Sequence, residues 1–189
     1  MDKQTEEILQ KIEEAEYVLV GLGQEFDMEF FLQSREDYRR IREELQQQNV
    51  LWLLPYVEEQ FRRQYLPEME AEIEKGLQKL AKVLEKKSYF VVSSSLNHKL
   101  AEVPWKKMLL KKERFVAPCG DWTKKQCPDG CEEGIQTVTE ADEEQLQESF
   151  KKLQTNGFSV PDLGKCPKCG KKLVLNNVYA GRYDEKGYL

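Results

Sequence analysis

The stretch YFVVSSSLNH, residues 89–98, is a short apolar run that passes into a polar turn. A continuous apolar run of this length is typical of a strand that is buried on both faces of a sheet. The stretch YVLVGLG, residues 17–23, has the same form and contains Gly21 and Gly23 at its end. Helical patterns lie before and between the two stretches, and this order predicts an α/β domain with a parallel sheet.

Helices are predicted where apolar residues recur with the helical period. Thr139 and Asp142 have the spacing of a capping box at the start of one such helix. Pro55 is expected to end a short strand over residues 49–56, and Pro67 is expected to break a long helical stretch. The other predicted elements are helices at 2–16, capped by Asp2, and at 35–48, 57–87 and 139–154, and a strand at 172–180.

The composition is that of a globular protein in water, since 40% of the 189 residues are hydrophobic, 33% are charged and the mean hydropathy is −0.70. The net charge is −5 and the lysine pairs are scattered, so no nucleic acid is expected as a partner. The sequence has no apolar run of about 18 residues and no signal peptide, which predicts no membrane association and a cytoplasmic location.

Four of the five cysteines form two pairs, each in a loop rich in Gly, Pro and Lys. Cys127 and Cys131 make a C-x3-C pair, and Cys166 and Cys169 make a C-x2-C pair. Four thiolates bind zinc tetrahedrally and leave no position for a substrate, so the sequence predicts a structural zinc site. Two disulfides, buried thiols or an iron–sulfur cluster are the alternatives. Five lysines are expected to temper the charge of the thiolates, namely Lys124, Lys125, Lys168, Lys171 and Lys172.

Together these segments resemble the sirtuins, and most of all their divergent bacterial members. YFVVSSSLNH is similar to a strand of the type YFVVTTNVDH, and CPKCGKKLVLNNVYAGRYDEKGYL is similar to a tail of the type CPxCGxxLxxN followed by E-x-GY. The resemblance covers residues 17–23 and 88–189. Sirtuins are NAD-dependent protein deacylases, and some act as ADP-ribosyltransferases. The resemblance therefore implies a partial Rossmann-like parallel sheet with an inserted small four-cysteine zinc-binding module, NAD as cofactor, and an acylated or ADP-ribosylated protein as partner.

The resemblance also implies roles for single residues. Gly21 and Gly23 match the glycine turn that holds the dinucleotide phosphates, and the serine of that turn falls on Glu25. Ser95 and Asn97 match the Asn and Asp that line the nicotinamide-ribose pocket in the T-x-N-x-D motif. The structural alternatives are a tight turn for the glycines and, for Ser95 and Asn97, side chains that satisfy only the turn backbone.

Cys119, followed by Gly120, occupies the position of the family's catalytic His-Gly pair. Cysteine is a poor general base at its usual pKa and more naturally a nucleophile, so a thiol-based activity is a further alternative. The single histidine, His98, is expected on a polar surface turn, although it could face the same cleft.

Residues 1–118 are expected to form the Rossmann-like part, with a helical insert at 28–87. Residues 119–189 are expected to form the zinc module and the start of the return to the Rossmann-like part. Because the sirtuin sheet continues beyond the zinc module, we expect the sequence to be a fragment of a longer protein. The predicted function is that of a sirtuin-like protein, a NAD-dependent protein deacylase or ADP-ribosyltransferase with degenerate catalytic motifs. A non-catalytic, zinc-stabilised binding module derived from a sirtuin is the alternative.

Overall fold

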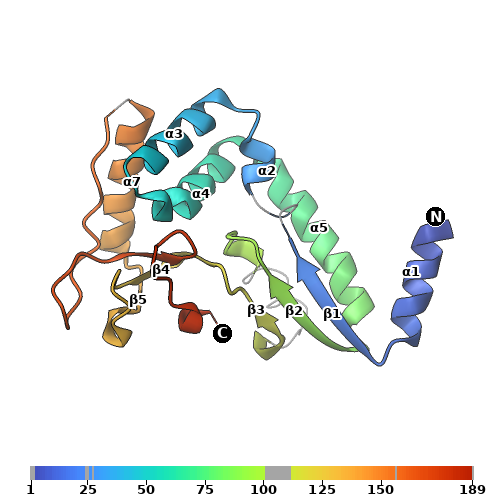
Figure 1. The fold of residues 1–189 in the computed structure, drawn as a ribbon. Coiled ribbons are helices and arrows are strands. Elements are labelled where there is room, and N and C mark those ends of the chain that lie inside the picture. The colour runs from blue at the N-terminus through green and yellow to red at the C-terminus, as the bar shows by residue number, and fades with distance from the viewer. Residues whose placement is uncertain (1–2, 24–25, 27, 101–111, 156, 189) are drawn as a thin grey trace.

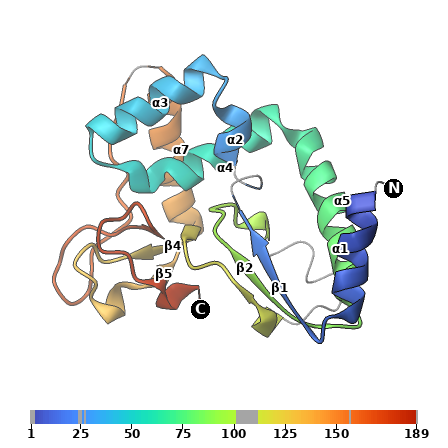
Figure 2. The ribbon, with the colours of Figure 1, turned by 45° about the vertical axis from the view of Figure 1, so that its right-hand side comes forward.

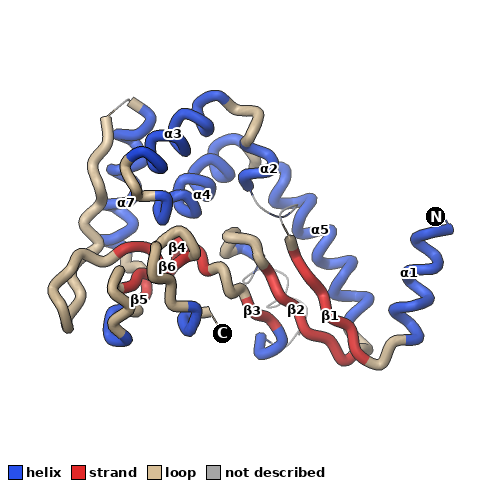
Figure 3. Tube along the Cα trace, viewed as in Figure 1, coloured by secondary structure: helices blue, strands red, loops and turns tan. Residues whose placement is uncertain are grey.

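The computed structural model describes residues 3–23, 26, 28–100, 112–155 and 157–188. These ranges form an α/β fold with two three-stranded sheets (Figure 1). One sheet is parallel and the other antiparallel, and Figure 3 shows them as two separate groups of strands. No helix within these ranges is long and apolar enough to cross a membrane.

The helices are α1 Lys3–Glu14, α2 Met28–Leu32, α3 Glu36–Gln47, α4 Leu54–Tyr65, α5 Pro67–Leu84 and α7 Glu140–Gln154. The strands are β1 Tyr17–Leu22, β2 Ser88–Ser93, β3 Phe115–Val116, β4 Gly120–Gln126, β5 Gln136–Thr137 and β6 Val174–Asn177. The helices predicted at 2–16, 35–48 and 139–154 are confirmed, while the cap residue Asp2 lies outside the described residues. Pro67 separates α4 from α5, as predicted, and opens α5.

The parallel sheet has the order β1-β2-β3, which confirms the predicted parallel pairing. Its side chains alternate between two faces, and α5 covers one face through Leu77 and Leu84. On the other face Leu19 and Phe90 are partners in the register and are 75% and 38% exposed. The expectation of strands buried on both faces is therefore wrong for this face. The sequence does not distinguish the covered face from the exposed one, because both faces carry apolar residues.

The antiparallel sheet has the order β5-β4-β6 and packs with α7 through Trp122, Leu146 and Leu175. The predicted capping box is confirmed, because the N–H of Asp142 donates to Thr139 Oγ1 and the N–H of Thr139 donates to the Asp142 carboxylate. β6 confirms part of the strand predicted at 172–180. Figure 2 shows α3, α4 and α7 gathered above this sheet.

Residues 49–56 do not form the predicted strand. A 3-10 turn, Leu51–Leu53, leads directly into α4, and Pro55 lies in the first turn of that helix. The first helical turn leaves its N–H groups unpaired, so a proline there removes no hydrogen bond. Trp52 and Leu54 are buried in the helical core, and a short apolar run does not distinguish a buried helix start from a strand.

The buried apolar side chains of the described residues form two clusters. The smaller cluster joins α5 to the parallel sheet through Leu77 and Leu84. The larger joins α3 and α4 to α7 and the antiparallel sheet, and in it the rings of Phe61 and Phe150 lie 5.8 Å apart at their centroids. The predicted helical insert, 28–87, is therefore shared between the two clusters, because α3 and α4 pack in one and α5 packs mainly in the other.

Candidate functional site

The four paired cysteines come together in the fold. We call them the four-cysteine cluster, which consists of Cys127, Cys131, Cys166 and Cys169. Their Sγ atoms all lie within 4.8 Å of one another, and those of Cys127 and Cys169 are 3.4 Å apart. Sulfurs at about 2.3 Å from a central zinc ion lie roughly 3.8 Å from each other, so the spacing is compatible with a structural zinc. None of the five cysteines is in a disulfide.

Glycines shape the loops that carry these cysteines. Gly130 and Gly170 both have a φ of 73°, in the left-handed region that side chains disfavour. Their N–H groups donate to the carbonyls of Cys127 and Cys166, at 3.0 and 2.9 Å. A Cβ on Gly134 would lie 2.5 Å from the Cβ of Cys127. The sequence therefore places glycine where the backbone must turn sharply or pass close to a thiol.

The surroundings of the cluster favour the thiolate at Cys127 but not at every cysteine, because the hydrogen bond with Cys127 raises the pKa of the Cys131 thiol. Cys127 and Cys166 are buried, whereas Cys169 is exposed. Burial would raise the pKa of the Cys127 thiol, but the N–H groups of Cys131 and Asp129 outweigh it and lower the pKa to about 7. A lowered pKa favours the thiolate, which is the form that binds a metal.

Lysines near the cluster have different partners. Lys171 pairs with Asp129 at 2.8 Å and so connects the two cysteine loops. Lys125 instead points into the core, where its ammonium donates to Asp142 and to the carbonyl of Leu163. The charge of Lys125 is therefore balanced by a buried carboxylate, and its expected role beside the thiolates is corrected.

A pocket of about 300 Å³ lies where the parallel strands end, which is the edge at which α/β sheets usually bind ligands. We call it the edge pocket. Its lining comes from α2, from the turn after β2 and from the segment after β6. The lining residues are Glu29, Phe30, Gln33, Ser94, Leu96, Val178 and Tyr179. Phe30 is 60% and Val178 43% exposed, so the pocket presents apolar surface to solvent.

The polar residues after β2 support their own turn. The N–H of Ser95 donates to Ser93 Oγ, and the N–H of Asn97 donates to Ser95 Oγ, both at 3.2 Å. The N–H of Lys99 donates to Asn97 Oδ1 at 3.1 Å. Ser95 is 2% exposed and also donates to the carbonyl of Phe26. These bonds match the structural alternative for Ser95 and Asn97, in which each side chain satisfies the turn backbone.

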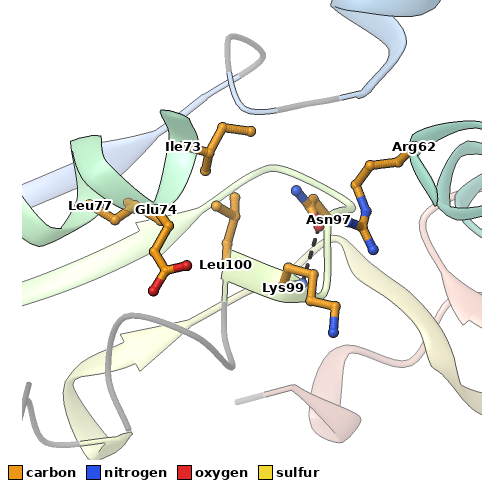
Figure 4. Close-up of a pocket in the computed structure, with 7 residues that line it drawn as sticks. All are labelled: Arg62, Ile73, Glu74, Leu77, Asn97, Lys99 and Leu100. Atoms are coloured by element: carbon orange, nitrogen blue, oxygen red, sulfur yellow. Dashed lines mark hydrogen bonds between the residues drawn. The ribbon is translucent and has the colours of Figure 1, made fainter. Parts of the chain in front are cut away.

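Asn97 lines a second, smaller hollow between α4 and α5 (Figure 4). The lining residues are Arg62, Ile73, Glu74, Leu77, Asn97, Lys99 and Leu100. The hollow offers about 20 Å³, which is enough for one water-sized group. In Figure 4 the guanidinium of Arg62 lies beside the Asn97 side chain. Ser94 and Asn97 therefore face different hollows, although they lie in the same turn.

Gly21 and Gly23 are not among the described residues that line the edge pocket. The carbonyl of Leu22, which lies between them, accepts the N–H of Ser94, a lining residue, at 2.9 Å. A Cβ on Gly21 would meet no atom within 4 Å, so no close approach requires glycine there. The carbonyl of Gly23 accepts the N–H of Phe26 at 3.1 Å in a tight turn. Glu25, which takes the place of the family's serine, lies outside the described residues.

Cys119 lies where the parallel sheet meets the antiparallel one, between β3 and β4. Its carbonyl accepts the N–H of Val178, a residue of the edge pocket, at 3.0 Å. Gly120 has a φ of 71°, and a Cβ there would overlap the carbonyl oxygen of Asn176, so only glycine fits. Tyr183 lies near Cys119. Burial raises the pKa of the Tyr183 hydroxyl most, and the negative charge of the Cys119 thiolate raises it further.

His98 is buried, which corrects the expectation of a surface histidine. Trp122 Nε1 donates to His98 Nδ1 at 3.0 Å, so in this arrangement Nδ1 carries no proton. Glu59 Oε2 lies 3.8 Å from the same nitrogen, and both Arg62 and Arg63 bind the Glu59 carboxylate. These partners come from α4 and β4, which are distant in sequence, so the turn pattern around His98 did not reveal its burial.

Most residues of the edge pocket were not predicted as site residues. Val178 and Tyr179 lie in the tail that carries the resemblance, and that position was their only signal. Glu29, Phe30 and Gln33 lie in a segment without a recognisable motif. The packing of α2 on α4 places these three residues at the pocket, and no sequence motif indicates that packing.

Comparison of the sequence with protein-family models finds no match, and comparison with curated proteins finds none either. The resemblance to sirtuins therefore rests on the quoted motifs alone.

Proposed function

We propose that the chain is a sirtuin-like protein that binds NAD, or a dinucleotide related to it, between a Rossmann-like parallel sheet and a zinc-stabilised module. The observation that carries the proposal is the composition of the edge pocket. Ser94 and Leu96 come from the strand end that resembles the family's motif, and Val178 and Tyr179 come from the tail that resembles it. Two motif segments that are distant in sequence thus meet at one pocket, as a shared binding site requires.

Zinc is the metal that we propose for the four-cysteine cluster. Four thiolates satisfy its tetrahedral preference and leave no position for a substrate, so its role is structural. Cys127 directly follows β4, and Cys169 precedes β6. The ion would therefore hold the ends of these strands together and support the segment after β6 that lines the edge pocket. Structural zinc contributes about 10–16 kcal/mol of apparent binding free energy in small zinc modules.

The edge pocket suits a part of a ligand that carries no negative charge. Glu29 is the one charged side chain among its described lining residues, and Arg42 Nε lies 3.2 Å from its carboxylate. Phe30 and Leu96 supply apolar surface, and Gln33 supplies an amide. The nicotinamide end of NAD and the acyl amide of a modified protein both have this mixed character. The pyrophosphate does not, and we place it outside this pocket.

A non-catalytic binding module derived from a sirtuin is the second candidate, and the state of the motif side chains favours it over a deacylase. Ser95 and Asn97 bond to their own turn, and His98 is buried against Trp122. Cys119 stands where the family has its catalytic histidine. If the protein is an enzyme, the resemblance makes it a transferase that acts on an acylated protein or ADP-ribosylates one.

The binding proposal is tested by thermal unfolding of the zinc-loaded protein with and without NAD. A ligand that binds the folded state raises the transition temperature, and we expect Val178→Trp to remove that rise by filling the edge pocket. Val160→Trp is the matched control, because Val160 is similarly exposed and does not line the pocket. A rise that survives Val178→Trp would place NAD elsewhere and contradict the proposed site.

Activity is a separate measurement. Release of nicotinamide from NAD in the presence of an acylated peptide identifies an enzyme, whereas NAD binding without release identifies the non-catalytic module. Cys119→His restores the family's residue at the catalytic position. A gain of nicotinamide release in that variant would support the correspondence, and an unchanged rate alongside intact NAD binding would argue against it.

A further inference from the structure

A buried histidine connects the two sheets, and neither the four-cysteine cluster nor the edge pocket uses it. His98 lies in the turn after β2, Trp122 lies on β4, and each is 7% exposed. Trp122 Nε1 donates to His98 Nδ1 at 3.0 Å, and the two rings meet edge to face with their centroids 5.1 Å apart. We call this contact the His98–Trp122 bond. Because this chain alone buries both side chains, the bond requires no sequence beyond it.

A carboxylate lies near the same nitrogen of His98. Glu59 Oε2 is 3.8 Å from Nδ1, and the Glu59 side chain is 3% exposed. The other oxygen, Oε1, accepts from Arg62 and Arg63 at 2.6 Å each, whereas Oε2 accepts from Arg62 Nε at 2.8 Å. An ionised carboxylate offers about four acceptor positions. The oxygen that faces His98 can therefore accept one more donor.

The His98–Trp122 bond exists only while Nδ1 of His98 carries no proton. In a protonated imidazole both ring nitrogens donate, so the N–H of Nδ1 would face the N–H of Trp122. Two donors repel each other, and a buried indole N–H without an acceptor is unfavourable. A small rotation of the ring brings the N–H of Nδ1 to Glu59 Oε2, where opposite charges attract. The structure thus holds one partner for each protonation state of His98.

The charged groups around His98 decide how easily it takes a proton, and β4 faces it with the uncharged Trp122. Among the described residues these groups are Glu59, Arg62 and Arg63 of α4, Glu74 of α5, Glu143 of α7, and Lys99 of the same turn. Glu59 favours the protonated ring, and the two arginines that bind it weaken this effect. Burial would raise the pKa of Glu59, but the hydrogen bonds of Arg62 and the charge of His98 outweigh it and lower the pKa. Glu59 is therefore ionised over the pH range in which a histidine titrates.

We propose that His98 is a pH-dependent switch that exchanges its hydrogen-bond partner between β4 and α4. The neutral ring accepts from Trp122 and joins the turn after β2 to β4. The protonated ring donates to Glu59 and releases Trp122. The exchange moves one proton from water onto Nδ1 and breaks no covalent bond.

Both sides of the His98–Trp122 bond contribute to the edge pocket. The turn after β2 supplies Ser94 and Leu96 to its lining. On the other side, the carbonyl of Cys119, just before β4, accepts the N–H of the lining residue Val178 at 3.0 Å. We therefore expect acidification to separate the two segments and to loosen the pocket, although His98 is not among its described lining residues.

The test is an NMR titration of the zinc-loaded protein between about pH 5 and 8, the range in which histidines change charge, with the zinc content checked at each pH. His98 is the only histidine in the sequence, so its imidazole signals need no assignment. The indole N–H signal of Trp122 is the one that Trp122→Phe removes. We expect both signals to change with one midpoint, and the amide signals of Ser94, Leu96 and Val178 to change with them.

Three variants separate the switch from other effects of pH. Trp122→Phe removes the donor that favours the neutral ring, so the His98 midpoint should rise by about 0.5–1 pH unit. Trp52→Phe is the matched control and should leave the midpoint unchanged, because Trp52 is similarly buried in the same core cluster and Trp122 is the donor to His98. His98→Gln keeps a hydrogen-bond acceptor but takes no proton in this range, so the Ser94 and Leu96 amides should lose their response to pH.

Three outcomes overturn the proposal. An imidazole that titrates while the Trp122 indole signal stays constant shows that His98 takes its proton without changing partner. An imidazole that does not titrate in the folded protein over this range shows that His98 is a fixed structural contact. A pH response of the Ser94 amide that persists in His98→Gln assigns the effect to another group.

Discussion

Lys125 and Asp142 form a buried ion pair in which the ammonium nitrogen lies 2.8 and 2.7 Å from the two carboxylate oxygens. Lys125 also donates to the carbonyl of Leu163, and Asp142 completes the capping box of α7 with Thr139. The pair therefore joins β4, α7 and the loop that leads to the second cysteine pair. It therefore holds together the strand that precedes Cys127 and the loop that precedes Cys166.

Removing one partner of this pair should be costly. Lys125→Met leaves the Asp142 carboxylate buried without its cation, and we expect the free energy of unfolding to fall by about 3–5 kcal/mol. Urea unfolding of the zinc-loaded protein measures this loss. Lys151→Met, an exposed lysine on α7, is the control and should change stability little. Equal urea midpoints for the two variants would contradict the role of the pair.

The same pair makes stability depend on pH. Burial would raise the pKa of Asp142, but hydrogen bonds from Lys125 and Thr139 outweigh it and hold the pKa below its ordinary value. The unfolded chain therefore binds the proton first as pH falls, so the stabilisation present above about pH 4 is lost below it. Asp142→Asn should flatten the curve of unfolding free energy against pH in this acidic range.

A matched carboxylate separates this effect from the acid release of metal. Glu148 on α7 is exposed and pairs with Lys152 at 2.7 Å. Glu148→Gln should reproduce the wild-type curve, because an exposed ion pair contributes little. If Asp142→Asn and Glu148→Gln give the same curve, the buried pair is not the source of the pH dependence.

Metal content distinguishes the four-cysteine cluster from the fifth cysteine. Cys127→Ser removes a buried ligand and should abolish stoichiometric zinc binding, together with much of the stability. Cys119→Ser should keep about one zinc per chain, because Cys119 lies at the joint between the two sheets and not in the cluster. Elemental analysis of the purified variants measures the zinc content per chain. Zinc kept by Cys127→Ser and lost by Cys119→Ser would refute the assignment of ligands.

Gly134 tests how closely the backbone approaches the cluster. An added methyl group would lie 2.5 Å from the Cβ of Cys127, so Gly134→Ala should displace that thiol and weaken zinc binding. Gly157→Ala is the control, since its methyl group would meet only an ordinary contact at 3.8 Å. Competition with a zinc chelator measures both affinities. Equal affinities would show that the loop adapts without moving Cys127.

Local patterns in the sequence predicted the parts of the fold that depend on local chemistry. The Thr139–Asp142 capping box formed as expected because its hydrogen bonds join residues three apart. The spacing of Cys127 and Cys131 anticipated the four-cysteine cluster, since each cysteine pair is closed by a short glycine turn. The run at 17–23 formed a strand, and its parallel partner was the run of similar form at 89–98.

Features that depend on distant partners were not predictable from the same patterns. The burial of His98 depends on Trp122 and Glu59, which come from elements far along the chain. Pro55 fits a strand end and a helix start equally well, and only the packing of α4 decides between them. The exposure of Leu19 depends on which face of the sheet the helices cover, and a single apolar run does not contain that information.

Calorimetric titration of NAD into the zinc-loaded protein tests the proposed function most directly. The sirtuin-like interpretation of the edge pocket predicts a saturable heat of binding with one site per chain, reduced by Val178→Trp and kept by Val160→Trp. Absence of any binding heat and of any stability shift at roughly millimolar NAD would contradict it.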